Sequence, residues 1–110
     1  MKKDKQQEQA IMALIVHGGD ARSKAIQAIR SAKSHDFEQA DTLIAECNQA
    51  LLQAHRIQTD LIQQEILEEE SSKVSLLMVH AQDHLMNAMT VRDLAVELID
   101  IVKQGGIKND

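Results

Sequence analysis

The absence of proline is the feature that most constrains how this chain of 110 residues can fold. Proline kinks or ends a helix because its ring blocks a backbone hydrogen bond, so a chain without it can form long helices. Only one residue is aromatic, Phe37, and the apolar content comes from Ala, Leu, Ile, Val and Met. A core of aliphatic side chains suits close-packed helices. We therefore expect an all-α fold, a helix bundle formed by a single domain over residues 1–110.

Apolar residues recur at helical spacing along nearly the whole chain, and the interruptions divide it into three segments. The first helix is expected to begin near Asp4. The pair Gly18-Gly19 is expected to interrupt it, because glycine costs about 1 kcal/mol in a helix interior, and Asp20 is expected to cap the continuation. The kink predicted there either lines a functional cleft or is a packing adjustment between helices. A short turn over 34–36 ends this segment.

The second helix is predicted from about residue 37 to residue 69, with Asp36 as its N-cap. Glutamates and serines over 68–72 are expected to close it. Negative charge at a helix C-terminus opposes the helix macrodipole, so this run is a poor continuation of the helix.

The third helix is predicted to start after Ser71 or Ser72, either of which can act as its N-cap. It reaches about Gln104 and ends at Gly105-Gly106, because glycine commonly terminates helices. Short connections make neighbouring helices antiparallel. The predicted fold is therefore an up-down-up three-helix bundle.

The predicted third helix carries apolar residues on two sides. The first group is suited to pack against the other two helices and consists of Leu77, Ala81, Leu85, Ala88, Ala95 and Val102. At about 100° per residue a second group clusters on another side. This group, which we refer to as the outer stripe, comprises Leu76, His80, Asp83, Asn87, Val91, Leu94 and Leu98. Either these residues widen the core of the domain or, as we favour, third helices of several copies meet around a symmetry axis.

Charge and cysteine content limit the partners and the compartment. A formal net charge of −5 disfavours nucleic acid as a partner, because phosphate backbones select basic surfaces. The single cysteine, Cys47, cannot form an internal disulfide, fits a reducing compartment and is expected to be an inert core residue. We find no signal peptide and no apolar run near the roughly 20 residues of a membrane helix. We therefore expect a cytoplasmic protein that does not insert into the membrane.

The third helix carries three side chains that can act in catalysis or bind a metal. They are His80, Asp83 and His84, at positions i, i+3 and i+4. Residues one turn apart have β-carbons about 5–6 Å from each other, so the two histidines share a face. A neutral imidazole nitrogen is nucleophilic near neutral pH and suits reversible phosphorylation. Gln82 points roughly 200° around the helix from His80, so its amide acts elsewhere. Two residues one turn apart on the second helix, His55 and Gln58, either face the polar residues of the third helix or are merely exposed.

Three interpretations of this spacing stay open. In the first, the histidines are polar residues on an interface, as single histidines usually are. In the second, the His-xxx-His spacing chelates zinc on one helix face, with Asp83 as a possible third ligand. In the third, His80 is the nucleophile of a phosphocarrier and the other side chains form its surroundings. The spacing alone favours the first two about equally and ranks the phosphocarrier last.

Three segments of the chain change this order. Residues 74–86 read VSLLMVHAQDHLM and resemble the phosphorylation segment of the lactose/cellobiose-type enzyme IIA of the bacterial phosphotransferase system. Residues 16–23, VHGGDARS, resemble the glycine break in the first helix of that family. Residues 54–63, AHRIQTDLIQ, resemble its second-helix segment. The resemblance covers essentially the whole chain, in order and at family length.

The resemblance implies a homotrimer in which His80 accepts a phosphoryl group and His84 is a neighbour able to stabilise it. The donor would be the histidine phosphocarrier protein HPr. The recipient would be a cysteine of the cognate enzyme IIB, which passes the group to a sugar entering through the membrane component, enzyme IIC. Asp83 would lie on the trimer axis, where family members can hold a divalent cation such as Mg²⁺; no organic cofactor is expected.

The same resemblance leaves the sugar open among cellobiose, chitobiose, lactose and related β-linked oligosaccharides. The carrier never contacts the sugar in this scheme, so its residues need not recognise one. The alternative function is a non-catalytic helical oligomer that binds a metal or a partner through His80, Asp83 and His84.

Overall fold

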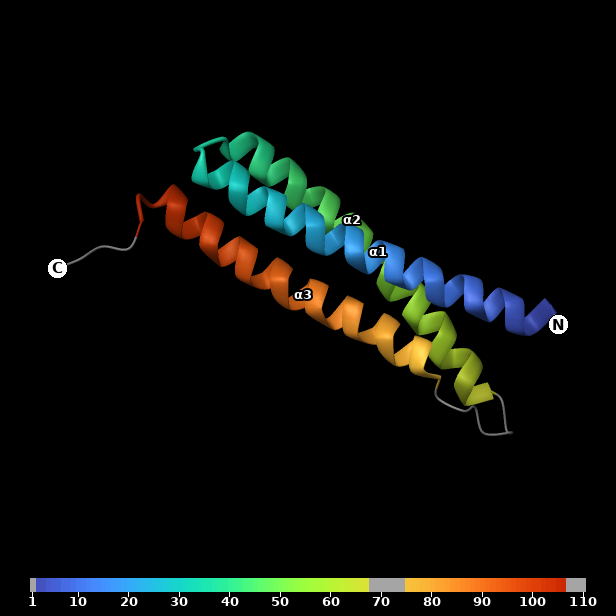
Figure 1. Cartoon of the computed structure of the whole chain (residues 1–110). Helices are drawn as coiled ribbons and strands as arrows, with labels where there is room; N and C mark the ends of the chain where they lie inside the picture. The colour runs from blue at the N-terminus through green and yellow to red at the C-terminus, as the bar shows by residue number, and fades with distance from the viewer. Residues whose placement is uncertain (1, 68–74, 107–110) are drawn as a thin grey trace.

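Three long helices account for nearly all of residues 2–67 and 75–106, the part of the chain described by the computed structural model. They are α1 (Lys2–Lys33), α2 (Phe37–Leu67) and α3 (Leu76–Lys103), and these residues contain no strand. The prediction of an all-α chain with three helices is confirmed. Figure 1 shows the helices lying lengthwise along a molecule of 60 × 26 × 19 Å, with successive helices running in opposite directions.

Each helix buries a stripe of residues spaced alternately three and four apart, which we refer to as its inner stripe. In α1 the inner stripe is Ile11, Leu14, Gly18, Ala21, Ala25, Ala28 and Ala32. In α2 it is Ala40, Leu43, Cys47, Ala50, Ala54 and Leu61, with the half-buried Ile57 in the series. In α3 it is Ala81, Leu85, Ala88, Ala95 and Ile99, with Arg92 in the series. This 3.5-residue period turns one face of each helix toward its neighbours, and alanine lets the backbones approach closely.

The α1 helix packs along both other helices, whereas α2 and α3 meet much less extensively. Side-chain hydrogen bonds join α2 to α3 between Gln58 and Gln82, between Asn48 and Arg92, and between Asp41 and Lys103. Arg92 occupies a position of the inner stripe but reaches out of the core, and its guanidinium donates to the Asn48 side-chain oxygen at 2.7 Å. The bundle is therefore held mainly by apolar packing on α1, with polar contacts between α2 and α3.

The α1 helix runs without a break through Gly18 and Gly19, so the predicted interruption and the cap at Asp20 are wrong. Both glycines have helical neighbours on either side, and α1 begins at Lys2, slightly before the predicted start. The physical reason is packing, because the flanking inner-stripe residues Leu14 and Ala21 are fully buried and hold the helix in place. Their burial offsets the intrinsic cost of glycine, about 1 kcal/mol for each residue.

The connection between α1 and α2 follows the prediction. Residues 34–36 form the turn, with His35 at a positive φ of 61°, and the Asp36 carboxylate accepts the backbone N–H of Gln39 at 3.1 Å. This bond satisfies one of the free N–H groups at the start of α2, as expected of an N-cap.

The start of α3 differs from the prediction, because its N-cap is Ser75 rather than Ser71 or Ser72. The Ser75 hydroxyl accepts the backbone N–H of Met78 at 3.0 Å, and its own backbone is extended as a cap requires. The predicted closing run over 68–72 lies outside the described residues. At the other end α3 stops as predicted, at Gly105 and Gly106, whose φ angles are 90° and 95°.

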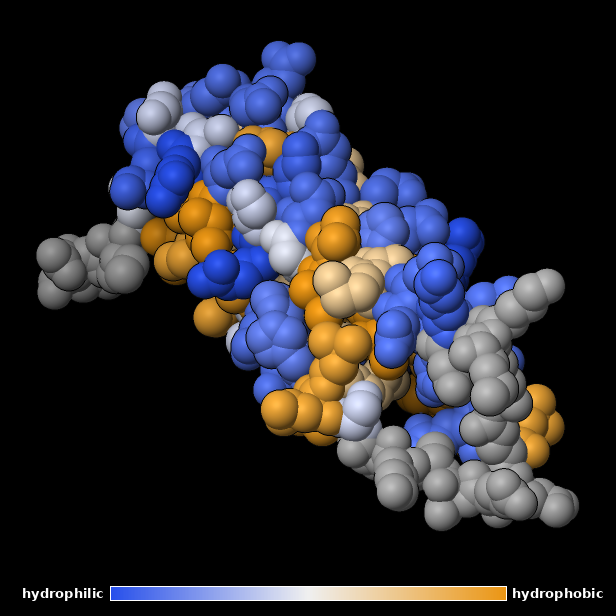
Figure 2. Space-filling view, turned by 45° about the vertical axis from the view of Figure 1, so that its right-hand side comes forward, coloured by the Kyte–Doolittle hydropathy of each residue, from blue (hydrophilic) through white to orange (hydrophobic). Residues whose placement is uncertain are grey.

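Large apolar residues of the outer stripe stay exposed in the single chain. Leu76 is 86% exposed, Leu94 58% and Leu98 44%, whereas Val91 is half-buried. Figure 2 shows a band of hydrophobic side chains crossing an otherwise polar face of the molecule. Val91 packs against the core of the isolated chain, but the three exposed leucines do not widen that core. For them assembly is the open interpretation. None of the helices in the described residues has an apolar stretch long enough to span a membrane.

Candidate functional site

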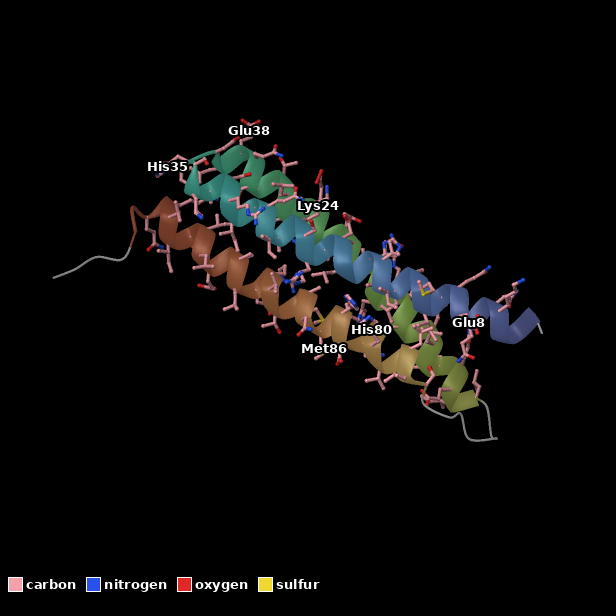
Figure 3. All side chains as sticks on the ribbon, in the orientation of Figure 1. Glu8, Lys24, His35, Glu38, His80 and Met86 are labelled. Carbon is pink, nitrogen blue, oxygen red and sulfur yellow. The ribbon has the colours of Figure 1, made fainter. Side chains whose placement is uncertain are left out.

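His80 and His84 lie one turn apart near the start of α3, and their rings meet. Their Nε2 atoms are 3.1 Å apart. The ring centroids are 4.6 Å apart and the ring planes are nearly perpendicular, at 87°. His80 is exposed and His84 is half-buried; Figure 3 labels His80 on α3, with Met86 further along the same helix. The spacing i, i+4 thus produces the shared face that the sequence predicts.

The contact between the two Nε2 atoms is a hydrogen bond in which one ring donates and the other accepts. A neutral imidazole carries its proton on one nitrogen and a lone pair on the other. When His84 donates from Nε2, the accepting lone pair belongs to Nε2 of His80, and the proton of His80 is on Nδ1. This arrangement orients a neutral, nucleophilic nitrogen next to a hydrogen-bond donor at the surface of the protein.

Gly18 of α1 lies directly against the backbone of His84. A β-carbon placed on Gly18 would be 3.3 Å from the carbonyl carbon of His84 and 3.4 Å from its Cβ, which is tighter than most such contacts. A β-carbon on Gly19 would meet nothing within 4 Å. The glycines therefore do not kink the helix, but the first of them brings α1 close to the site. The inner-stripe spacing of Gly18 with Leu14 and Ala21 is the sequence signal that reveals this contact.

Within the described residues, neither Asp83 nor Gln82 joins the two histidines. Gln82 binds Gln58 on α2, which confirms that the Gln82 amide acts elsewhere and that Gln58 faces α3. Asp83 is exposed. In the described ranges of one chain, the side chains of His, Cys, Asp and Glu form no group of three or more that can hold a metal ion. A three-ligand metal site that combines His80, Asp83 and His84 within one chain is therefore not formed.

Flexible apolar side chains flank the histidine pair along α3. Val79 is adjacent to His80 in the chain and is exposed, as are Met86 and Met89 in the following turns. Methionine adapts its shape to different contacts because its side chain is unbranched and polarizable. The surface around His80 is suited to docking against another protein.

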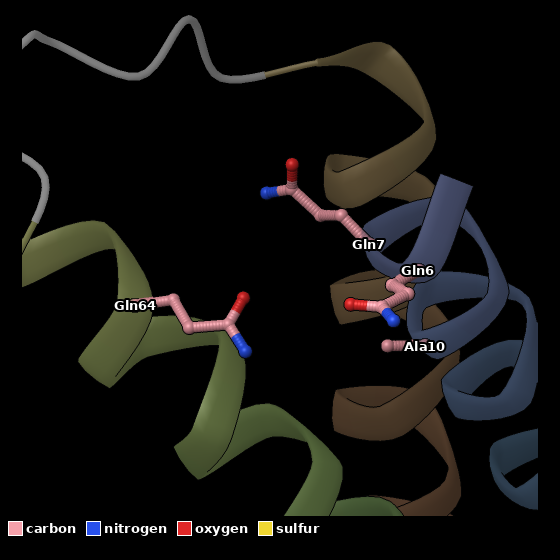
Figure 4. Close-up of a pocket in the computed structure, with 4 residues that line it drawn as sticks. All are labelled: Gln6, Gln7, Ala10 and Gln64. Carbon is pink, nitrogen blue, oxygen red and sulfur yellow. The ribbon is translucent and has the colours of Figure 1, made fainter. Parts of the chain in front are cut away.

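A pocket between α1 and α2 is a weaker candidate for a functional site. Figure 4 shows Gln6, Gln7 and Ala10 of α1 opposite Gln64 of α2, and these four residues line it. Three neutral amides and a methyl group supply neither a nucleophile nor a general acid or base. Among the described residues, the histidine pair is therefore the stronger candidate site.

Cys47 is buried in the inner stripe of α2 and forms no disulfide. Burial raises the pKa of its thiol above the ordinary value of 9.0; Arg92 lowers the pKa and Asp20 raises it, each by a smaller amount. The thiol is therefore uncharged near neutral pH and a poor nucleophile. The prediction of an inert core cysteine agrees with this environment.

Residues 9–103 match the family described as "PTS system, Lactose/Cellobiose specific IIA subunit". The chain is 48% identical over 101 residues to the lichenan-specific phosphotransferase enzyme IIA component of Bacillus subtilis (strain 168), covering 92% of this chain and 91% of that protein. The histidine pair thus lies in a chain that matches this family over most of its length.

Two experimental structures have a similar fold. The crystal structure of the cellobiose-specific enzyme IIA from Bacillus anthracis superimposes with a TM-score of 0.84 at 44% identity, covering 89% of each chain. The solution structures of the IIA(Chitobiose)–HPr complex of the Escherichia coli phosphotransferase system give a TM-score of 0.80 at 42% identity, covering 89% of this chain and 94% of that one. The second of these relatives binds HPr in the structure described.

Proposed function

This chain belongs to the lactose/cellobiose-specific IIA family of the PTS system, and on that premise we propose that it carries phosphoryl groups on His80. The observation that most directly supports this role is an exposed imidazole whose Nε2 is held 3.1 Å from a second imidazole nitrogen. The proposed donor is HPr, as the complex formed by the E. coli relative suggests. The proposed recipient is the cysteine of a cognate enzyme IIB, which serves the membrane component, enzyme IIC.

Each proposed transfer exchanges one bond to phosphorus for another. In the accepting step, the lone pair of a ring nitrogen of His80 bonds to phosphorus while the bond between phosphorus and the donor's nitrogen breaks. In the second step, the thiolate of enzyme IIB bonds to phosphorus, and the electron pair of the breaking N–P bond returns to His80. Transfer between two side chains depends mostly on positioning and on stabilisation of charge on the phosphoryl oxygens.

His84 is proposed to stabilise that charge. Bonding of phosphorus to Nε2 of His80 uses the lone pair that accepts from His84, so the hydrogen bond between the two rings breaks. The Nε2 proton of His84, which lies next to that nitrogen, then bonds to a phosphoryl oxygen instead. This favours Nε2 of His80 as the reacting nitrogen. Loss of the donor in His84→Ala is expected to slow phosphorylation by about a hundredfold, the usual cost of removing one donor from a charge-stabilising site.

We also propose that the apolar residues of the outer stripe join three copies of the chain, with Asp83 near the axis and His80 left accessible at the edge of the contact. Asp83 lies among exposed apolar residues of α3, and within the described part of its own chain it has too few ligating neighbours to hold a metal. Three converging carboxylates repel one another, so a divalent cation such as Mg²⁺ is the proposed means of neutralising them. Sedimentation equilibrium of the wild type and of Asp83→Asn, with and without a chelator, tests this. A monomeric wild type, or an assembly indifferent to both changes, contradicts it.

The function is tested by mixing the full chain with phosphoenolpyruvate, enzyme I and HPr and weighing the intact protein. A single acid-labile phosphoryl group is expected on the wild type and none on His80→Gln. His55→Gln is the matched control, because His55 is also an exposed histidine but belongs to α2 rather than α3. An unmodified wild type beside fully phosphorylated HPr, or equal labelling of His80→Gln, disproves the proposal. The cytoplasmic location stays a prediction, as does the class of β-linked sugar.

A further inference from the structure

We propose that His80 and His84 also form a two-nitrogen chelating site for Zn²⁺ and related transition-metal ions, and that an ion bound there blocks the phosphoryl-accepting nitrogen. The blocking of phosphorylation rests on the proposed function, whereas the binding of metal does not. This site is distinct from the cation proposed on the axis, because it uses ring nitrogens of one chain rather than carboxylates from three.

The geometry of the pair matches the needs of a zinc ion. Zn–N bonds of 2.0–2.1 Å at a tetrahedral angle separate two ligating nitrogens by about 3.3–3.4 Å. The Nε2 atoms of His80 and His84 are 3.1 Å apart without any metal. The Nε2–Nε2 distance therefore changes by only a few tenths of an ångström. Each ring also turns about its side-chain torsions, so that its lone pair points at the ion instead of along the line between the two nitrogens. Both ligands come from one turn of a helix, so binding requires no change of fold.

The protons of the pair allow this exchange. The hydrogen bond requires a proton on one Nε2, whereas the chelate requires lone pairs on both, with both ring protons on Nδ1. One ring therefore changes tautomer when the ion binds, and neither ring needs to lose a proton overall. Imidazole nitrogen suits Zn²⁺, Cu²⁺ and Ni²⁺, while Mg²⁺ prefers oxygen ligands, so Mg²⁺ is not expected to bind the pair.

The position of the pair makes the site open and its occupancy reversible. His80 is exposed and Asp83 does not join the pair, so water fills the remaining coordination positions. The ion and the phosphoryl group use the same lone pair on Nε2 of His80, and only one of them can bond to it at a time. Metal binding and phosphorylation are therefore mutually exclusive, and each is expected to weaken the other.

The binding test uses the untagged full chain, titrated with Zn²⁺ against a chromophoric chelator. One ion per chain is expected for the wild type. His84→Ala and His80→Ala are each expected to lower the affinity at least tenfold, since even outer-shell changes cost roughly 10–100-fold. His55→Ala is the matched control and is expected to bind as the wild type does, because residue 59, one turn along α2 from His55, is a threonine. Equal affinity in the wild type and both pair variants overturns the proposal.

A second measurement does not depend on variants that must fold. In ¹⁵N spectra of the imidazole rings, Zn²⁺ is expected to shift the Nε2 signals of His80 and His84 together and to leave those of His55 unchanged. Movement of only one of the two rings, or none, overturns the chelate.

The blocking step is tested with HPr that has been phosphorylated and purified beforehand, so that zinc acts on no earlier enzyme. Zn²⁺ is expected to reduce transfer to the wild-type chain at least tenfold, and a zinc-selective chelator is expected to restore it. Transfer unaffected by saturating Zn²⁺ overturns the blocking step. If the chain takes no phosphoryl group even without zinc, the proposed function fails, and the titration still decides the metal site by itself.

Discussion

The inner and outer stripes of α3 lie on one helix yet are built differently. The inner stripe consists mainly of alanine with Leu85 and Ile99, and its apolar residues are buried against α1 and α2. The outer stripe presents Leu94 and Leu98 to solvent beside His80 and Asp83. Small residues suit a contact where two backbones approach closely, whereas large exposed ones suit a contact that forms later with another molecule. The apolar residues of the inner stripe are thus buried within one chain, whereas the exposed leucines of the outer stripe can be buried only by contact with another molecule.

The largest expected effect compares two leucines of α3. Leu85→Ala is expected to cost about 2–5 kcal/mol of unfolding free energy, because it opens a cavity at a fully buried position. In the dissociated chain, Leu94→Ala is expected to change the unfolding free energy by no more than about 0.5 kcal/mol. A larger loss is expected only at concentrations where the chain assembles. Urea unfolding at several protein concentrations measures both. Equal losses for the two variants at every concentration contradict the distinction between the stripes.

A smaller effect is expected from the neighbouring glycines of α1. Gly19→Ala is expected to stabilise the protein by about 0.5–1 kcal/mol, since alanine is the better helix former and the space is open. Gly18→Ala is expected to lose that gain because its new methyl group presses on the His84 backbone. Thermal unfolding of the two variants measures the difference. Equal stabilisation by both shows that α1 and α3 are not in close contact at this point.

An effect confined to high pH concerns Cys47, which tests the burial of the inner stripe of α2. Its folded pKa is raised above the ordinary 9.0, so its contribution to stability is present in full below pH 9. The contribution declines as the pH rises above 9, because the unfolded thiol then ionises while the buried one does not. The slope is at most about 1.4 kcal/mol per pH unit. Unfolding free energies of the wild type and Cys47→Ala between pH 8 and 10 measure it; identical slopes contradict a buried thiol.

Much of the fold can be predicted from the sequence, because the local signals for helix starts and ends agree with the way the helices pack. The absence of proline, the turn before Phe37 and the glycines after Gln104 predict three helices close to those observed. The break at Gly18 fails for a physical reason. The cost of glycine in a helix, about 1 kcal/mol, is outweighed when the flanking residues are fully buried. In the sequence, only the alternating spacing of three and four residues in the inner stripe indicates that burial. Ser75 as the cap of α3 was likewise missed among several nearby serines.

The candidate site was predictable in its members but not in its geometry. The spacing of His80 and His84 predicts a shared face, yet it does not specify that their Nε2 atoms meet, because side-chain torsions decide that distance. The spacing also leaves Asp83 within one helical turn of the pair, and only the structure separates it from them. The roles of His80, His84 and Asp83 stay predictions until phosphorylation and assembly are measured.

The alanine-rich inner stripes have a consequence for recognition. An alanine side chain has no rotamers to lose, so ordering it costs essentially no side-chain entropy. For the same reason, the alanines of the packed helices have no alternative rotamers. The α3 backbone that carries His80 therefore cannot shift by repacking these side chains. The proposed carrier would then offer both of its proposed partners the same preorganised surface. The adjustment to each partner would be made by the exposed side chains of Val79, Met86 and Met89.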